Sequence, residues 1–144
     1  MKISTKCRYG FRAVLQIAEL YGSVPCKRKE IVKRQKLSDS YLENILIMLK
    51  SSGLIETTRG IKGGYVLSRP PEEITLLEIF IALEGPLQLV ECVDLPEKCI
   101  NSQECITRTV WKKLSDSWKA ILSDMTLQSL LDQKNSTDCH NFCI

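Results

Sequence analysis

The first third of the chain places apolar residues at intervals of three and four, the period of an α-helix that packs on one face. This spacing predicts three helices, at residues 5–22, 27–35 and 39–51. A brief turn through Lys36 and Leu37 separates the last two. Ser38 is a good N-cap for the third helix, and Ser40 with Glu43 also fits the spacing of a capping box. Two helices joined by so short a turn indicate a helix-turn-helix.

The pattern changes directly after the third helix. The stretches "LIETT" and "YVLS" have the composition of short strands and flank the glycine-rich "RGIKGG". Gly60, Gly63 and Gly64 allow the positive φ angles of a hairpin tip, where Arg59 and Lys62 also lie. A basic hairpin that follows a helix-turn-helix predicts a winged helix, which is a much more specific pattern than either piece alone.

The rest of the chain divides at Pro70 and Pro71, which interrupt the pattern. Thr75 and Glu78 form a capping box at the start of a connecting helix, and a segment with neither helical nor strand periodicity follows it. We therefore expect a winged helix-turn-helix domain, a connecting helix, a cysteine-rich loop, a dimerisation helix region and a polar tail, at residues 1–70, 71–86, 87–106, 107–131 and 132–144.

The long helix predicted from residue 107 onward carries one apolar stripe. Its members are Val110, Trp111, Leu114, Trp118, Ile121, Leu122 and Met125. Pairing with a second copy would cover this stripe, and two-fold symmetry makes that arrangement the favoured one. Folding back onto its own domain is the alternative. In the paired arrangement, both tryptophans belong to the dimer core. The expected fold is mainly α-helical with a small β-wing.

The net charge of +3 conceals a strong division along the chain. Residues 1–69 carry fourteen Lys or Arg and five Asp or Glu, a net charge of +9, whereas residues 70–144 carry six and twelve, a net charge of −6. A basic half joined to an acidic half indicates that the first half meets a polyanion. A chance imbalance of solvated faces is the alternative.

Several classes of protein fit the sequence poorly. No apolar run approaches the eighteen or so residues that span a bilayer, and the N-terminus lacks a secretory signal, so we expect a cytoplasmic protein. The single histidine, His140, leaves no catalytic set of Ser/His/Asp or Cys/His type. The glycine-rich tip precedes a strand and not a helix, so it is no phosphate cradle. We therefore expect no enzyme.

Seven cysteines are present, and Cys92, Cys99 and Cys105 lie within one polar stretch, "VECVDLPEKCINSQEC". Thiols stay reduced in the cytoplasm, so an odd number with clustered spacing favours metal binding over disulfides. The stretch is too polar to be core, whereas Cys26 is expected to be buried. The spacings match neither the paired ligands of structural zinc sites nor the runs of ferredoxins, so the metal stays open at this point.

DNA binding requires cations that displace counterions from phosphate and a rigid element that enters the major groove. The third helix supplies that element, with Ser40, Tyr41 and Glu43 near its N-terminus. A carboxylate there would be repelled by phosphate unless it accepts a hydrogen bond from a cytosine amino group. Lys62 lies on the wing. Arg28 is expected to contact the backbone, and a solvated face is the equal alternative.

Specific motifs make the chain recognisable. "YLE", "RGIKGGYVL", "EITLLEI", "ALEGP" and the triple cysteine resemble the bacterial winged-helix regulators typified by IscR, NsrR and CymR, from Met1 to about Leu131. The resemblance implies a homodimeric DNA-binding repressor or activator that reads an inverted repeat. It further implies that Ser40, Glu43 and Arg59 touch base edges, with Arg59 reaching into the minor groove.

The cysteine triplet resembles that of the iron–sulfur members of this family. That resemblance implies a cluster, [2Fe–2S] above zinc, on Cys92, Cys99 and Cys105, with iron–sulfur assembly proteins as further partners. The family pattern has a histidine as fourth ligand where this chain has Arg108, which cannot ligate. An oxygen donor is one substitute, and the other candidates are Cys7 from a partner subunit, Cys139, His140 and Cys143.

Two other functions compete with cluster sensing. The tail "NFCI" resembles that of clusterless relatives, which govern cysteine metabolism through a partner enzyme and lack the triplet. An iron–sulfur redox carrier is the alternative from a different class, although it would have no use for the basic half. If a cluster binds, its gain or loss is expected to shift one recognition helix relative to its twin.

Overall fold

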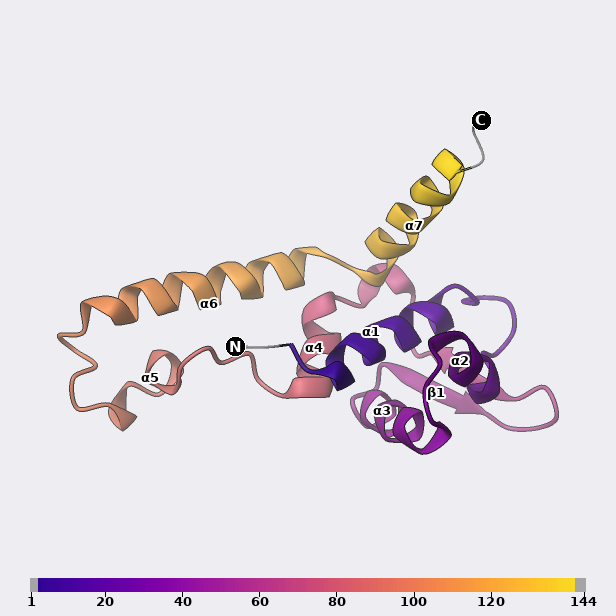
Figure 1. The fold of residues 1–144 in the computed structure, drawn as a ribbon, viewed down its shortest axis with the longest axis horizontal. Coiled ribbons are helices and arrows are strands. Elements are labelled where there is room, and N and C mark those ends of the chain that lie inside the picture. Colours follow the sequence, from indigo (N-terminus) through magenta and orange to yellow (C-terminus); the bar gives the residue numbers. More distant parts are fainter. Residues whose placement is uncertain (1–2, 142–144) are drawn as a thin grey trace.

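Three helices and a hairpin form the N-terminal part of the chain in the computed structural model, which describes residues 3–141 (Figure 1). The hairpin is antiparallel, with Ile55 opposite Leu67. The elements are α1 (Thr5–Ala18), α2 (Arg28–Gln35), α3 (Asp39–Ser51), β1 (Ile55–Thr58) and β2 (Gly64–Leu67). This order confirms the predicted winged helix-turn-helix.

The start of α3 differs in one detail from the sequence expectation. Ser38 is the N-cap, and its hydroxyl accepts a hydrogen bond from the backbone N–H of Tyr41 at 3.3 Å. The capping box expected from Ser40 and Glu43 is therefore wrong, because both residues already lie inside the helix. Their side chains are exposed and take no part in starting it.

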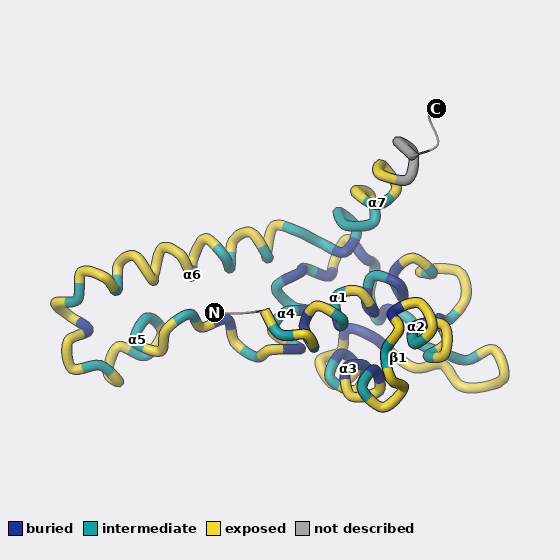
Figure 2. Tube along the Cα trace, viewed as in Figure 1, coloured by how far each residue is buried: buried dark blue, intermediate teal, exposed yellow. Residues whose placement is uncertain are grey.

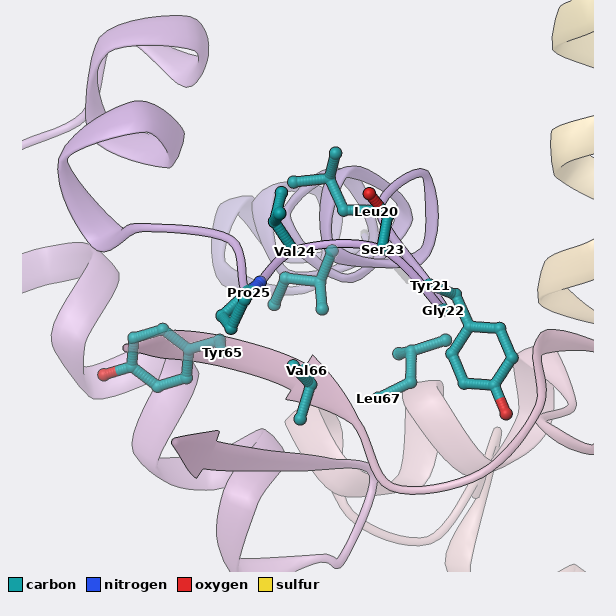
Figure 3. A pocket seen from close by; sticks show the side chains of 10 residues that line it. Leu20, Tyr21, Gly22, Ser23, Val24, Pro25, Tyr65, Val66 and Leu67 are labelled. Carbon is teal, nitrogen blue, oxygen red and sulfur yellow. The ribbon is translucent and has the colours of Figure 1, made fainter. Parts of the chain in front are cut away.

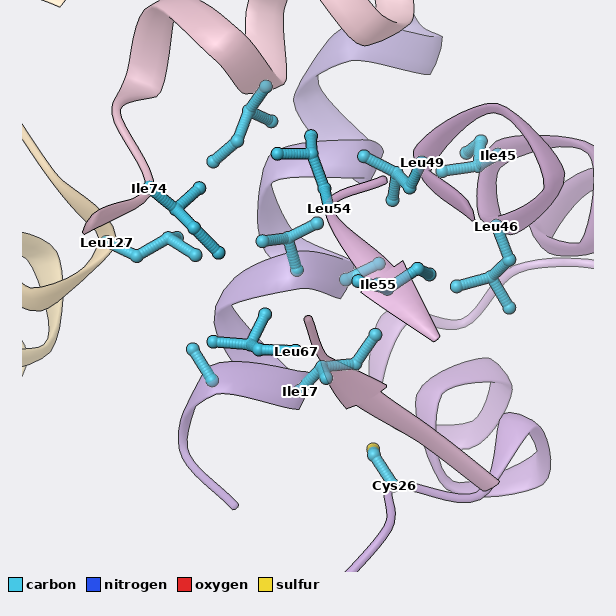
Figure 4. Close-up of a cluster of buried hydrophobic side chains, with 14 of the residues drawn as sticks. Ile17, Cys26, Ile45, Leu46, Leu49, Leu54, Ile55, Leu67, Ile74 and Leu127 are labelled. Carbon is cyan, nitrogen blue, oxygen red and sulfur yellow. The ribbon is translucent and has the colours of Figure 1, made fainter. Parts of the chain in front are cut away.

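One hydrophobic core joins the helices, the hairpin and a residue from near the end of the chain (Figures 2 and 4). Cys26 is fully buried in it, as expected, and burial raises the pKa of its thiol to about 11. The largest fully buried side chains are Ile17, Ile31, Leu42, Ile45, Leu46, Leu49, Leu54, Ile55, Ile74, Ile79, Leu83 and Leu127.

An arm of residues 85–124 extends from this unit (Figure 1). Before it come the 3-10 turn η1 (Pro71–Glu73) and α4 (Leu76–Glu84), which begins with the predicted capping box of Thr75 and Glu78. The chain then runs outward through α5 (Glu91–Asp94) and η2 (Pro96–Lys98) and returns along α6 (Ile106–Asp124). The long helix is confirmed.

After α6 the chain rejoins the N-terminal unit. The Leu76 N–H donates to the Met125 carbonyl and the Leu127 N–H to the Ile74 carbonyl, both at 2.9 Å. Leu127 is fully buried and starts α7 (Leu127–Asn141). The end of the predicted dimerisation region therefore belongs to the first unit, and the predicted polar tail is helical as far as Asn141.

A partly exposed carboxylate, that of Glu19, ties α7 to the helix-turn-helix. Glu19 accepts hydrogen bonds from Arg34 of α2, at 2.7 Å, and from Lys134 of α7, at 2.5 Å. Burial alone would raise the pKa of Glu19, but these two hydrogen bonds outweigh it and hold the pKa below its ordinary value. No helix among residues 3–141 is both long enough and apolar enough to cross a membrane.

Candidate nucleic-acid interface and cysteine segment

Helix α3 buries one face and exposes the other, as a recognition helix must. Leu42, Ile45, Leu46 and Leu49 are buried, while Ser40, Glu43 and Asn44 are exposed. Tyr41 is only half-buried, because its ring packs edge-on against Tyr9 with the centroids 6.4 Å apart. The exposed face thus presents three small or medium polar side chains, which suits hydrogen bonding to base edges.

The wing tip projects Arg59 and Lys62 into solvent, as expected. The expected positive φ is found only at Gly60, at 105°. The expectation of a positive φ is wrong for Gly63 and Gly64. Glycine is needed at these two positions because other backbone atoms lie too close to leave room for a Cβ. A Cβ on Gly63 would lie 2.3 Å from the Thr58 carbonyl oxygen, and one on Gly64 would lie 2.6 Å from that of Cys26.

Between the end of α1 and β2, at the base of the wing, lies a groove of about 200 Å³ (Figure 3). Its lining includes Leu20, Val24, Pro25, Tyr65 and Val66 and contains no charged side chain. The groove thus offers shape and apolar surface but no acid or base.

Arg28 lies at the start of α2 and reaches across to α3. Its guanidinium is 2.9 Å from the Asp39 carboxylate and 3.1 Å from that of Glu43. The sequence reasoning missed this pairing. Its signal was the spacing of Asp39 and Glu43, which stand one turn apart on one face of a helix beside a basic segment.

The cysteine segment, residues 87–105, holds three partly exposed thiols. Cys92 lies in α5, Cys99 follows η2, and Cys105 directly precedes α6. The Thr107 hydroxyl lies 3.1 Å from the Cys105 sulfur, and this hydrogen bond lowers the pKa of the thiol. Among the side chains that the structure describes, which end at Thr137, no group of three or more His, Cys, Asp or Glu residues is gathered closely enough to hold a metal ion.

Arg108, in the position of the family histidine, holds the outgoing chain of the arm. Its Nε donates to the Cys92 carbonyl at 2.8 Å and its Nη2 to the Val93 carbonyl at 3.4 Å. Lys119 pairs with Asp94 at 3.3 Å. Helix α6 is therefore fastened to α5 by two cations.

The candidates for a fourth ligand differ in accessibility. Cys7 is 1% exposed, and burial raises the pKa of its thiol to about 11. It lines an apolar cavity of about 330 Å³ together with Phe80 and Trp118, where α1, α4 and α6 meet. The side chains of Cys139 and His140, and Cys143 altogether, fall outside what the structure describes.

The apolar stripe of α6 is divided between two roles. Trp118 packs on Phe80 of its own chain, with ring centroids 5.6 Å apart, so its ring already has a partner within the chain. Its expected place in a dimer core stays a prediction. Leu122 and Met125 also pack against the domain core. The exposed remainder consists of Val110, Trp111, Leu114 and Ile121, which are 57%, 41%, 52% and 58% exposed.

This architecture matches that of a known family of proteins. Residues 3–133 match the family model described as "Rrf2: Iron-dependent Transcriptional regulator". The chain is 37% identical to the transcriptional regulator CymR of Bacillus subtilis over 130 residues, which cover 90% of this chain and 89% of that protein.

Solved structures agree. The B. subtilis CymR structure, described as the global cysteine regulator, superposes with a TM-score of 0.81 at 35% identity and covers 92% of this chain and 98% of that one. The structure of T. potens IscR superposes with a TM-score of 0.76 at 34% identity and covers 93% of this chain and 88% of that one. With the winged helix, the long helix of the arm and this match over nearly its whole length, the chain belongs to the Rrf2 family of transcriptional regulators, and it is not an enzyme.

Proposed function

We propose that the protein is a cytoplasmic homodimer that reads an inverted-repeat DNA operator. Helix α3 would enter the major groove with Ser40 and Glu43 near base edges, and Arg59 and Lys62 of the wing would meet the adjacent groove and backbone. The net charge of +9 on residues 1–69 supports placing this half of the chain against DNA. Two recognition helices would lie about 34 Å apart, one helical turn of DNA.

The exposed remainder of the α6 stripe supports the dimer. Trp111 and Leu114 are large apolar side chains left in solvent on a helix that projects from the domain. A second copy can cover the same surface on both chains, as two-fold symmetry requires. The dimer would then set the distance between the two recognition helices.

We further propose that Cys92, Cys99 and Cys105 hold an iron–sulfur cluster, with [2Fe–2S] the favoured type. The single observation that carries this is the placement of all three thiols, partly exposed, on one segment between α4 and α6. The donors fit the group in kind: thiolates are its usual ligands, and the hydrogen bond from the Thr107 hydroxyl lowers the pKa of the Cys105 thiol. When bound, such a cluster supplies a redox- and oxidant-sensitive centre.

The chain itself offers a path from this segment to DNA. The segment is fastened to α6 through Arg108 and Lys119, and α6 packs through Trp118 on α4, which joins the DNA-binding unit. Gathering three separated thiols would move the outgoing chain against α6. Any resulting shift of α6 would change the spacing of the two recognition helices, and hence affinity for the operator.

The test is an anaerobic visible spectrum with iron and sulfide analysis, on wild type and on a variant with Cys92, Cys99 and Cys105 replaced by alanine. We expect about two irons and two sulfides per chain in the wild type and none in the variant. Cys26→Ala serves as a control that keeps the triplet, because it removes a buried thiol that is not among the candidate ligands. Equal operator affinity and salt dependence of cluster-loaded and cluster-free protein would refute the sensing role.

A second candidate is a clusterless regulator that works with a protein partner. It is favoured by Arg108, which holds the Cys92 and Val93 carbonyls without a metal. Protein that stays colourless after reconstitution, yet binds the operator, would support this function. Arg108→His separates the two: it should raise cluster occupancy in a cluster-binding protein and leave a clusterless one colourless.

A further inference from the structure

Arg28 is paired with two carboxylates at once, whereas Arg34 and Arg69 are each paired with one. The Arg28 guanidinium bridges two helices, with Nη2 at 2.9 Å from Asp39 Oδ2 and Nη1 at 3.1 Å from Glu43 Oε1. Lys29, the next residue of α2, is exposed and has no ion pair with any side chain that the structure describes. The two cations are thus neighbours in sequence with different surroundings.

Geometry explains why an arginine suits this position. Asp39 and Glu43 stand one turn apart on α3, and two carboxylates at that spacing repel each other. A guanidinium has separate N–H groups in a rigid fork, so one side chain can satisfy both carboxylates at once. A lysine ammonium is a compact point charge and lacks this fork.

The pairing controls what α3 presents to DNA. Arg28 approaches Glu43 at Oε1, 3.1 Å from Nη1, and Oε2 accepts no hydrogen bond from the residues that the structure describes. That oxygen remains available to accept from a cytosine amino group. The neighbouring cation also offsets part of the repulsion between this carboxylate and the DNA phosphates.

We propose that Arg28 is a positioning residue for base discrimination, which holds Glu43 in its reading orientation, and that it is not a phosphate contact. This inference rests on the proposed reading of DNA by α3. It departs from the sequence expectation, under which Arg28 either contacts the backbone and carries little sequence information or lies on a solvated face.

The experiment begins with the wild-type dimer and a pool of random DNA duplexes, from which the preferred operator is selected. Base preference at each operator position is then measured by fluorescence anisotropy for Arg28→Gln, Glu43→Gln, the double variant and Lys29→Gln. Lys29→Gln is the matched control, because it makes the same change in charge one residue away. Thermal melting by circular dichroism verifies that each variant is folded.

We expect Glu43→Gln to lower the preference for cytosine at one operator position by about tenfold. Arg28→Gln should lower it at the same position, and the double variant should lose no more than Glu43→Gln alone. Lys29→Gln should weaken binding to all duplexes alike and keep the preference.

Two results would overturn the inference while leaving the proposed function intact. One is an Arg28→Gln variant that binds every duplex more weakly by one factor, with a salt slope reduced by about one, as loss of a phosphate contact predicts. The other is a Glu43→Gln variant with unchanged preference at every position. If the wild type enriches no sequence from the pool, the proposed reading of DNA fails, and this inference fails with it.

Discussion

The winged helix-turn-helix unit together with α4 holds the buried apolar core, whereas in the arm of residues 85–124 Leu87 is the only buried hydrophobic side chain (Figure 2). In the unit, Leu83, Ile79 and Ile45 are fully buried. On the arm, Trp111 and Leu114 are exposed and the three segment cysteines are only partly covered. The contrast indicates that the core lies in the unit, with α4 and Leu127, and that the arm offers apolar and thiol side chains for contact with a second copy or a bound group.

The largest effect is expected where α1 meets α4. Leu83 is fully buried against Gly10, whose added Cβ would lie 2.4 Å from the leucine Cδ1. Leu83→Ala should lower the free energy of unfolding by about 2–5 kcal/mol, because it leaves a cavity in this contact. Ile81 lies on the same helix, and its side chain is 44% exposed. Ile81→Ala should therefore lower the free energy of unfolding by only about 1 kcal/mol or less. Urea denaturation followed by circular dichroism measures both, and equal losses would contradict the assigned core.

The next largest effect is expected in the rates at which the cysteines of the two regions are alkylated. Burial raises the pKa of Cys7 and Cys26 from 9.0 to about 11, which reduces their thiolate fraction at neutral pH about a hundredfold. Alkylation of metal-free protein, followed by mass spectrometry, should modify Cys92, Cys99 and Cys105 first. In urea, which unfolds the protein, the alkylation rates of these five cysteines should become similar. Rapid labelling of Cys7 in the folded protein would mean that the unit is more open than described.

The exposed stripe of α6 should matter to assembly more than to folding. Trp111→Ala should weaken the dimer by about tenfold or more, because large aromatic side chains dominate such interfaces. The thermal melting of the winged unit should change little. Sedimentation velocity across a dilution series measures the dimer, with Lys113→Ala as a polar control on the same helix. A dimer that survives Trp111→Ala unchanged would place the interface elsewhere.

The smallest expected effect is at the junction of α7 with the winged unit. Glu19→Gln removes the carboxylate that Arg34 and Lys134 share, and should cost about 1 kcal/mol at neutral pH, since the group is partly exposed. The pKa of Glu19 is lowered by folding, so its contribution is present above the ordinary value of 4.5 and is lost as the pH falls through the folded-state pKa.

Urea denaturation of wild type and Glu19→Gln from pH 7 down to pH 3 tests this. The two proteins should converge at low pH, because the wild-type carboxylate is then protonated and resembles the amide. A constant gap across this range would show that the effect is not due to charge.

The local features were predictable because they depend on neighbours in sequence. Helical periodicity located α1 to α4 and α6, the Thr75–Glu78 capping box was found where expected, and the strand pattern located the wing. Errors arose where two local signals competed. Ser38 and Ser40 both fit the start of α3, and only the backbone conformation selected Ser38.

The sequence by itself therefore determined α1 to α4, α6, the wing, the basic half and the family, since periodicity, charge and motifs are written in order along the chain. The tertiary structure alone decided how distant segments meet. It buried Leu127 against Ile74, divided the α6 stripe at Trp118, and paired Arg28 with Glu43 across two helices. Periodicity shows which face of a helix is apolar, but the covering of that face and the partner of each charge depend on contacts between segments far apart in sequence.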